Sequence, residues 1–409
     1  MRQPQHEPMT GAPDRVTIYE VGARDGLQNE KSIVPVDVKA EFVRQMLAAG
    51  LQTVEITSFV SPRWVPQLAD AADLVSALGA DALGTQRPVL VPNERGLDRA
   101  LDLGVSSVAI FGSATETFAA KNLNSTVLDQ FTMFEPVAKR AKDEGLWLRA
   151  YVSMCFGDPW EGDAPIDQVV DVCARMIDLG ADQLSLGDTI GVATTGHVRR
   201  LLDALGERGI GADRIAVHFH DTYGQALANS LEAIRLGVRT IDASAGGLGG
   251  CPYAESATGN LATEDLVWAL HGMGVETGVD LEALVTTSVW MAEQLGRPSP
   301  SRVVKALSGG CPAPAPRIPG PGLGERAGVV ARGPWPELAL GGQLDREGLC
   351  HGSAERSRVL VGRHRLGDDP VGDPGLDELG RGDALTQGHL GGVVRGAVDD
   401  DRGALRWQR

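Results

Sequence analysis

The sequence of 409 residues lacks several features that would place it in a familiar class of proteins. No apolar run is long enough to span a bilayer, and the first residues, MRQPQHEPMTGAPDR, have no apolar core of the kind found in secretory signals. We therefore expect neither a membrane partner nor a secretory leader. Zinc-finger spacings, phosphate-binding loops and the Rossmann fingerprint are absent from the sequence as well.

Cysteine and positive charge are both scarce. The five cysteines are scattered and odd in number, which favours reduced thiols in the cytoplasm over a disulfide framework; Cys155 and Cys173 have apolar neighbours and are predicted to be structural. Lysine and arginine together number 38 against 54 aspartates and glutamates, a formal net charge of −16. This excess of negative charge argues against nucleic acid as a partner, because phosphates need a basic face. An anionic substrate would have to be bound by local arginine and lysine side chains.

The chain changes in character near Leu307. The segment SGGCPAPAPRIPGPG breaks the pattern, and the remainder is rich in glycine and arginine, contains no lysine and shows no sustained period of 2 or 3.6 residues. We predict a tail over residues 308–409 that has no packed structure. Two explanations stay open: a flexible tail, or the translation of a shifted or extended reading frame in GC-rich DNA. The composition favours the second, which would make the tail a non-native extension.

Residues 14–307 alternate short β-rich runs with amphipathic helical stretches. We predict eight strands that begin at residues 16, 53, 88, 107, 146, 183, 215 and 239. We predict helices over residues 36–49, 95–103, 127–144, 166–179, 196–205 and 225–236, with further C-terminal helices over 262–273 and 281–295. Eight strands that each lead into a helical crossover match a closed parallel (β/α)8 TIM barrel, an α/β fold, in number and size. A doubly wound open sheet is the alternative.

Polar side chains gather at the ends of the predicted strands. Side chains two residues apart on a strand point the same way, so His218 and His220 in IAVHFH can face one point. Asp25 follows the first strand and Asn260 comes after the eighth, at the barrel face where active sites assemble. We predict a metal site made of Asp25, His218, His220 and the amide oxygen of Asn260, although two histidines alone would more often mark an ordinary strand end. These ligands favour Mg²⁺ or Mn²⁺, because no thiolate is among them.

A thiol and three charged groups complete the predicted site. Cys251 lies in the glycine loop GGLGGCPY, which suits a mobile proton donor beside a metal; the alternative is a small buried filler. Arg24, Glu55 and Asp188 also lie at or after strand ends. For two of them a structural role stays open, Glu55 as a scaffold partner of Arg24 and Asp188 as the cap of a turn.

Five segments carry a resemblance to a known family. They are GARDGLQNEK, VEITSFVSPRWVPQ, SLGDTIGV, HFHDTYGQALAN and GGLGGCPYAESATGNLATEDL. Together they resemble hydroxymethylglutaryl-CoA lyase, which belongs to a metal-dependent aldolase and lyase group with the isopropylmalate and homocitrate synthases. The resemblance covers about residues 14–307, and the tail has no counterpart in the family. The stretch YVSMCFGDPWEGDAP departs from the family pattern at Asp158 and Trp160.

The resemblance implies a barrel, usually dimeric, that splits 3-hydroxy-3-methylglutaryl-CoA into acetyl-CoA and acetoacetate in leucine breakdown. It also implies that the metal is held by the four ligands named above and that the catalytic set is Arg24, Glu55, Asp188 and Cys251. Lys31 and Lys121 are weaker candidates for binding CoA phosphates. The alternatives are a Claisen-type synthase of the same group, a lyase acting on another 3-hydroxyacyl-CoA, and a metal-binding scaffold without catalysis.

Overall fold

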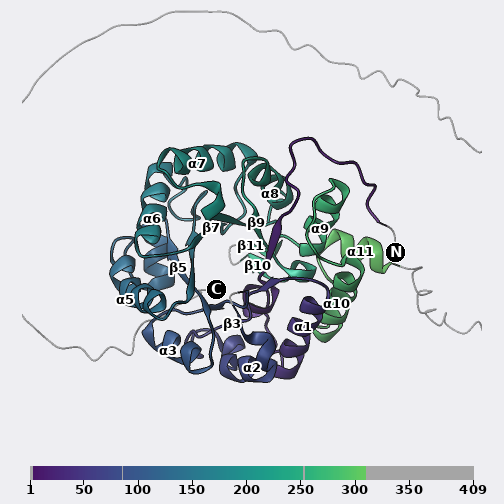
Figure 1. The fold of residues 1–409 in the computed structure, drawn as a ribbon, viewed down its shortest axis with the longest axis horizontal. Helices are drawn as coiled ribbons and strands as arrows, with labels where there is room; N and C mark the ends of the chain where they lie inside the picture. The colour runs from purple at the N-terminus through teal and green to yellow at the C-terminus, as the bar shows by residue number, and fades with distance from the viewer. Residues whose placement is uncertain (1–2, 85, 252–253, 310–409) are drawn as a thin grey trace, which may run out of the picture. The chain divides into compact units, whose positions relative to one another are not determined.

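The computed structural model describes residues 3–84, 86–251 and 254–309, and for residues 251 and 254–258 it describes the backbone alone. Parallel strands stand at the centre and helices surround them (Figure 1). The strands of the main sheet are β1 (Thr17–Glu20), β2 (Thr53–Val54), β3 (Thr57–Ser58), β4 (Val89–Leu90), β5 (Ser107–Ser113), β6 (Trp147–Ser153), β7 (Gln183–Asp188), β8 (Ile215–Phe219) and β9 (Thr240–Ala243).

The sheet closes into a barrel. Its strands pair in the order β2-β1-β9-β8-β7-β6-β5-β4-β3. The two strands at the ends of this order, β2 and β3, are separated in the chain by Glu55 and Ile56 alone, so they are halves of one interrupted strand. Backbone hydrogen bonds continue through the interruption: the amide of Glu55 donates to Glu20 at 2.8 Å and that of Ile56 to Pro88 at 3.0 Å. The predicted (β/α)8 barrel is therefore confirmed, and the open-sheet alternative is excluded.

The helices follow the predicted pattern closely. They are α1 (Val36–Ala48), α2 (Ala71–Leu78), α3 (Glu94–Asp102), α4 (Glu116–Phe118), α5 (Asp129–Asp143), α6 (Ile166–Asp178), α7 (Thr195–Glu207), α8 (Ala226–Arg235), α9 (Thr263–Gly272), α10 (Leu281–Gln294) and α11 (Arg302–Ser308). Every predicted helix is present, with ends shifted by two residues at most. The short helices α2, α4 and α11 were not predicted, because so few turns leave little periodicity to read.

Side-chain burial explains why these segments form these elements. The strands are covered on both faces, so β5 buries Val108, Ala109 and Ile110 completely, as expected for a parallel sheet. Helix α6 buries one stripe, which includes Cys173, and Cys155 is buried in the chain after β6. Both are free thiols in the apolar core, which confirms their structural assignment.

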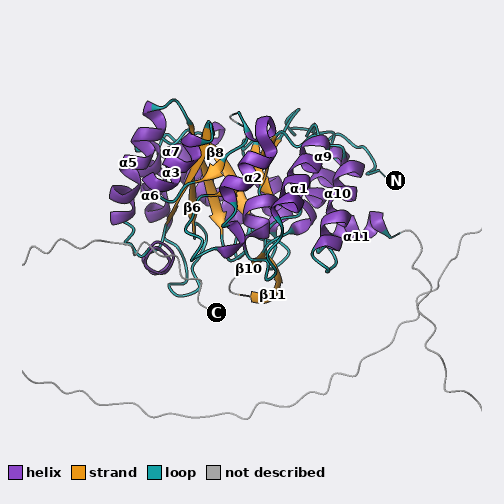
Figure 2. Ribbon diagram, turned by 90° about the horizontal axis from the view of Figure 1, so that it is seen from below, coloured by secondary structure: helices purple, strands orange, loops and turns teal. Residues whose placement is uncertain are grey.

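The end of the barrel at which the strands finish carries an extra element. An antiparallel hairpin, β10 (Gly250–Cys251) with β11 (Ala254–Thr258), follows β9 and projects beyond the barrel (Figure 2). This hairpin was not predicted, because its glycine-rich sequence lacks strand periodicity. Among the described residues, no helix is both long enough and apolar enough to cross a membrane. The predicted tail falls outside the described residues beyond Gly309, so its lack of packed structure stays a prediction.

Candidate active site

A pocket opens at the carboxyl ends of the strands, with a volume of about 910 Å³ that includes its open mouth. One part of its wall is polar and holds Arg24, Asp25, Tyr151, His218 and His220. Another part is apolar and is made of Val60, Val65, Leu90, Phe111, Phe118 and Val152. The pocket therefore combines charged groups with an apolar surface at the barrel face where active sites form.

Arg24 is held rigidly at the pocket wall. It lies with Asp25 in η1 (Gly22–Gly26), a single turn of π-helix directly after β1. Its Nε donates to Oε2 of the buried Glu55 at 2.7 Å, and its Nη1 donates to Oδ1 of Asp25 at 2.7 Å. The hydroxyl of Tyr151 donates to the same Glu55 oxygen at 3.0 Å. The scaffold pairing of Glu55 with Arg24 is thus present, and it aims a fixed cation into the pocket.

Three of the predicted metal ligands come together. Asp25, His218 and His220 each bring one potential ligand atom within 4.8 Å of the others, and together they could hold a metal ion. The two imidazole rings lie 5.3 Å apart, as expected for residues that share one face of a strand end. Asp25 follows the first strand and His218 lies on β8, and the pairing of β9 with both β1 and β8 brings these distant parts of the chain together.

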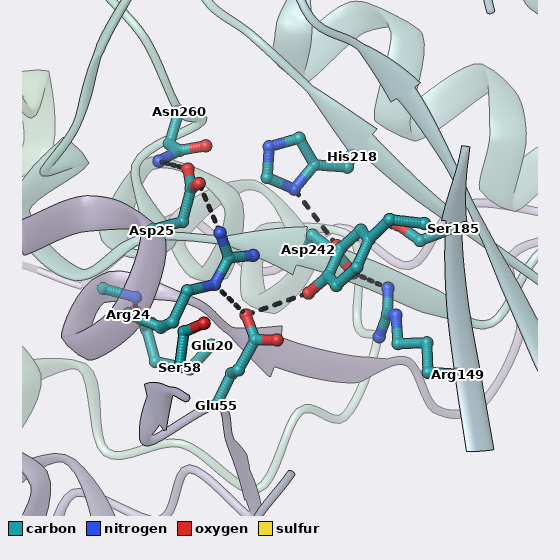
Figure 3. A network of polar contacts seen from close by, with 12 residues as sticks. Glu20, Arg24, Asp25, Glu55, Ser58, Arg149, Ser185, His218, Asp242 and Asn260 are labelled. Atoms are coloured by element: carbon teal, nitrogen blue, oxygen red, sulfur yellow. Dashed lines mark hydrogen bonds and ion pairs between the residues drawn. The ribbon is translucent and has the colours of Figure 1, made fainter. Parts of the chain in front are cut away.

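Asn260 lies next to this triad, and its amide oxygen has no partner among the described residues. The residue is brought there by an isolated antiparallel bridge to His220. Its Nδ2 donates to Asp25 Oδ2 at 2.8 Å and to the carbonyl of Leu248 at 3.0 Å. Its Oδ1 is buried and accepts no hydrogen bond from the described residues. Figure 3 shows this oxygen pointing toward His218. A buried acceptor without a donor is costly, and a cation between these groups would satisfy it, so the residues fit a metal ion.

The charge states of two members of the triad, Asp25 and His220, suit metal binding. Burial works to raise the pKa of Asp25, but the nearby Arg24 and the histidines outweigh it and lower that pKa to about 2. Burial lowers the pKa of His220 to about 4. At neutral pH the carboxylate is therefore ionised and the His220 ring is neutral, which is the protonation state that a metal ligand needs.

Three residues of the site were missed by the sequence analysis, namely Arg149, Tyr151 and Asp242. Arg149 and Tyr151 share the inner face of β6, and the buried Asp242 lies on β9 in register with His218. Arg149 and Asp242 form an ion pair that is wholly buried inside the barrel. A charged residue in the middle of an apolar strand, as in LWLRAYVS and RTIDAS, is the signal that could have revealed Arg149 and Asp242.

The other predicted residues lie at different places. Asp188 ends β7, and its carboxylate accepts hydrogen bonds from the amides of Val192 at 2.9 Å and Ala193 at 3.1 Å, as expected for the cap of a turn. Burial raises its pKa to about 7. Among the described residues that line the pocket, the chain neighbours Gly187 and Thr189 are present and Asp188 is not. Its assignment as a catalytic base stays a prediction.

The remaining predicted residues are the thiol and the two lysines. The side chain of Cys251 falls outside the described part of the structure, but the preceding residue, Gly250, lines the pocket. Lys31 is exposed in the chain after β1. Lys121 is exposed as well, and its Nζ lies 4.9 Å above the ring centre of Trp160. Its neighbour Asn122 lines the pocket, so Lys121 stands near the rim.

Comparisons with known proteins show the family of this chain. The HMGL-like family matches residues 15–290. The mitochondrial hydroxymethylglutaryl-CoA lyase of Arabidopsis thaliana is 47% identical over 308 residues, which are 75% of this chain and 65% of that relative. A cytoplasmic 3-hydroxy-3-methylglutaryl-CoA lyase of Rattus norvegicus is 44% identical over 298 residues, which are 73% of this chain and 86% of that relative.

Solved structures of HMG-CoA lyases are similar to this chain as well. The HMG-CoA lyase of Bacillus subtilis is 42% identical with a TM-score of 0.70, and the match covers 74% of this chain and all of that one. An HMG-CoA lyase of Acinetobacter baumannii, solved in complex with coenzyme A and 3-methylmalate, is 31% identical with a TM-score of 0.68 over 76% of this chain and all of that one. Fold, site and relatives define a carbon–carbon lyase built on a (β/α)8 barrel. More particularly, the chain belongs to the HMGL-like family.

Proposed function

We propose that this chain cleaves 3-hydroxy-3-methylglutaryl-CoA to acetyl-CoA and acetoacetate with the help of a divalent metal ion, in leucine catabolism. The observation that carries the proposal is the cluster of Asp25, His218 and His220 beside the amide oxygen of Asn260, which has no hydrogen-bond partner in the described part of the chain. It lies in the wall of a pocket that also holds a fixed cation, Arg24. Relatives that match most of the folded part of the chain are named for this reaction.

The four ligands would hold Mg²⁺ or Mn²⁺, since carboxylate, amide and imidazole donors without thiolate suit these ions. A bound ion would supply Lewis acidity, which acidifies the tertiary hydroxyl of the substrate and orients its oxygens. The ionised Asp25 and the neutral His220 are ready for this role without losing a proton at neutral pH.

Arg24 would stabilise the charge that develops when the bond between C2 and C3 breaks. The departing two-carbon fragment is a thioester enolate, whose negative oxygen needs a cation close by. Glu55 and Asp25 hold the guanidinium at 2.7 Å each, so it does not have to reorganise during the reaction. Such fixed donors contribute about 10²–10³-fold to turnover in other enzymes.

One proton transfer would precede the bond cleavage and a second would follow it. Asp188, acting directly or through a water molecule, would take the proton of the tertiary hydroxyl, and its pKa of about 7 suits a base at neutral pH. Cys251 would then deliver a proton to the enolate carbon. Gly250 lines the pocket, which supports a place for the next residue close to the reacting atoms.

The remaining proposals concern the surroundings of the enzyme. Lys31 and Lys121 would meet CoA phosphates at the pocket rim; the coenzyme A complex of the Acinetobacter baumannii relative supports an acyl-CoA substrate. We further propose a homodimer in the cytoplasm, as the family resemblance and the cysteine usage predict. Size-exclusion chromatography with light scattering measures whether the protein is a dimer.

Product analysis tests the proposed reaction. Metal-stripped protein is incubated with 3-hydroxy-3-methylglutaryl-CoA, with and without Mg²⁺ or Mn²⁺. Equal amounts of acetoacetate and acetyl-CoA should form only when metal is present. Consumption of acetyl-CoA together with a 2-keto acid, and no cleavage, would instead identify a Claisen-type synthase.

A further inference from the structure

Asp242 links the interior of the barrel to the metal site. It lies on β9 and is buried, and both of its carboxylate oxygens are engaged. Oδ1 accepts a hydrogen bond from Nη2 of Arg149. Oδ2 accepts one from Oγ of Ser185 at 3.0 Å and lies 3.1 Å from Nδ1 of His218 (Figure 3). The carboxylate therefore stands between a buried cation and a predicted metal ligand.

The contact with His218 has a direct consequence for the imidazole. A carboxylate can only accept, so the ring nitrogen that faces Asp242 must carry the proton. In the neutral ring the other nitrogen, Nε2, then keeps its lone pair. Figure 3 shows this second nitrogen on the side where Asp25 and Asn260 lie. The ring is thus held in the one tautomer that can donate electrons toward the site.

Arg149 explains why the carboxylate stays in place. Its guanidinium lies inside the barrel, 3.6 Å from the ring centre of Tyr19, and both members of its ion pair with Asp242 are fully buried. Among the described residues, Nε and Nη1 of Arg149 have no hydrogen-bond partner. A buried ion pair of this kind adds little to stability, because desolvation offsets its attraction. A role in orienting the Asp242 carboxylate toward His218 explains the ion pair better.

His220 provides a contrast within the same site. Its Nδ1 is buried and accepts or donates no hydrogen bond among the described residues. Its place is set instead by the backbone bridge to Asn260. Within the described part of the chain, a carboxylate therefore contacts Nδ1 of His218 and none contacts Nδ1 of His220.

We propose that Asp242 is a positioning residue that sets the tautomer and orientation of His218, and that Arg149 holds the Asp242 carboxylate in the required pose. The functional meaning rests on the proposed metal-dependent lyase activity. The tautomer itself is a property of the chain alone and can be measured without metal or substrate.

Asp242→Asn tests the proposal because Arg149 restricts how the new amide can turn. A guanidinium donates only, so the amide oxygen should face Arg149 and the NH₂ group should face His218. That group would donate to Nδ1 and drive the proton to Nε2, which is the wrong tautomer for the site. Ser185→Ala is the matched control, since it removes the other donor to Oδ2 and leaves the carboxylate facing His218.

The tautomer is measured by ¹⁵N NMR of the imidazole rings in metal-free protein at alkaline pH, where the rings are neutral. The His218 signals are assigned from their loss in His218→Gln. Wild type and Ser185→Ala should show protonated Nδ1 at His218, and Asp242→Asn should show protonated Nε2. Mn²⁺ affinity, measured by electron paramagnetic resonance, should fall by about 10–100-fold in Asp242→Asn and by less than about threefold in Ser185→Ala.

Two results would overturn the proposal. One is protonated Nε2 at His218 in the wild type, a measurement that does not require Asp242→Asn to fold. The other is a folded Asp242→Asn protein that keeps both the wild-type tautomer and the wild-type Mn²⁺ affinity. If the tautomer changes as expected but the wild-type protein fails to cleave the substrate, the proposed reaction fails and the positioning role stands.

Discussion

Asn260 donates a hydrogen bond from its amide nitrogen to Asp25 at 2.8 Å, and this contact is one of two that determine which way the amide faces. With the nitrogen engaged by Asp25 and by the Leu248 carbonyl, the oxygen must point into the site. One residue thereby orients another predicted metal ligand, although the two are 235 positions apart in the chain.

Gly249→Ala should disturb this amide. A Cβ at Gly249 would lie 2.5 Å from Nδ2 of Asn260, and the glycine has a φ of +112°. We expect Mn²⁺ affinity to fall by roughly tenfold or more, the range seen when the support of a metal ligand is removed. Gly84→Ala is the control, because Gly84 has a similar φ of +103° with nothing within 4 Å of the added carbon. Equal affinity in both variants, measured by calorimetry, would show that Asn260 is not a ligand.

Arg24→Lys should lower kcat by about 100-fold or more at saturating metal and substrate. An ammonium group is a point charge and cannot bond Glu55 and Asp25 in the fork geometry that the guanidinium has. Arg199→Lys on the surface of α7 should leave kcat unchanged, since Arg199 pairs with Glu232 of the neighbouring helix α8, away from the pocket. A kcat near that of wild type in Arg24→Lys would remove the fixed cation from the mechanism.

Sequence reasoning succeeded where a local pattern carries the information. The eight strands could be predicted because parallel strands buried on both faces are continuous apolar runs, as in SVAIF and IAVHFH. Asp25, His218 and His220 could be grouped because the carboxyl ends of all the strands of a barrel lie at the same face. Neither inference required knowledge of which strand pairs with which.

The rest depends on register and environment, which the sequence does not state. That Asp242 faces His218 follows from the pairing of β8 with β9, residue against residue. Arg149 and Asp242 pair across the inside of the barrel, and no periodicity in the sequence predicts this pair. The engagement of Asp188 by two backbone amides likewise depends on how the following turn folds.

Stability should fall as the pH rises from about 5 to about 8. Burial raises the pKa of Glu264 to about 8 and that of Glu20 to about 7, so the folded state holds protons that the unfolded chain releases above its ordinary pKa. This contribution to stability is complete below the unfolded pKa and is lost as the pH passes toward the folded value. Denaturant unfolding at several pH values measures it.

Glu264→Gln isolates the effect. A neutral amide removes the titration, so the pH-dependent loss should be smaller than in wild type by on the order of 1–4 kcal/mol over this range. The exposed Glu293 supplies the control substitution, Glu293→Gln, which should behave as wild type. A wild-type unfolding free energy that is constant or increases over this range would refute the assignment.

Cys251→Ser should lower turnover by orders of magnitude and leave metal affinity near that of wild type. A hydroxyl keeps the size and one donor but is a far weaker acid than a thiol, whose ordinary pKa is about 8.5. Cys155→Ser serves as the comparison; this thiol is buried away from the mechanism, and its loss should cost only stability. Normal turnover in Cys251→Ser would exclude the thiol as the proton donor, and lost metal affinity would make it a ligand.

The most direct test of the central claim is a titration of metal-stripped protein with Mn²⁺ during cleavage of 3-hydroxy-3-methylglutaryl-CoA. If Asp25, His218, His220 and Asn260 form the metal site, acetoacetate release should rise from near zero and saturate at one Mn²⁺ per chain. His218→Ala should show neither tight Mn²⁺ binding nor activation, while its circular dichroism spectrum stays that of the wild type. Full activity of the metal-stripped protein, or normal activation of His218→Ala, would contradict the account.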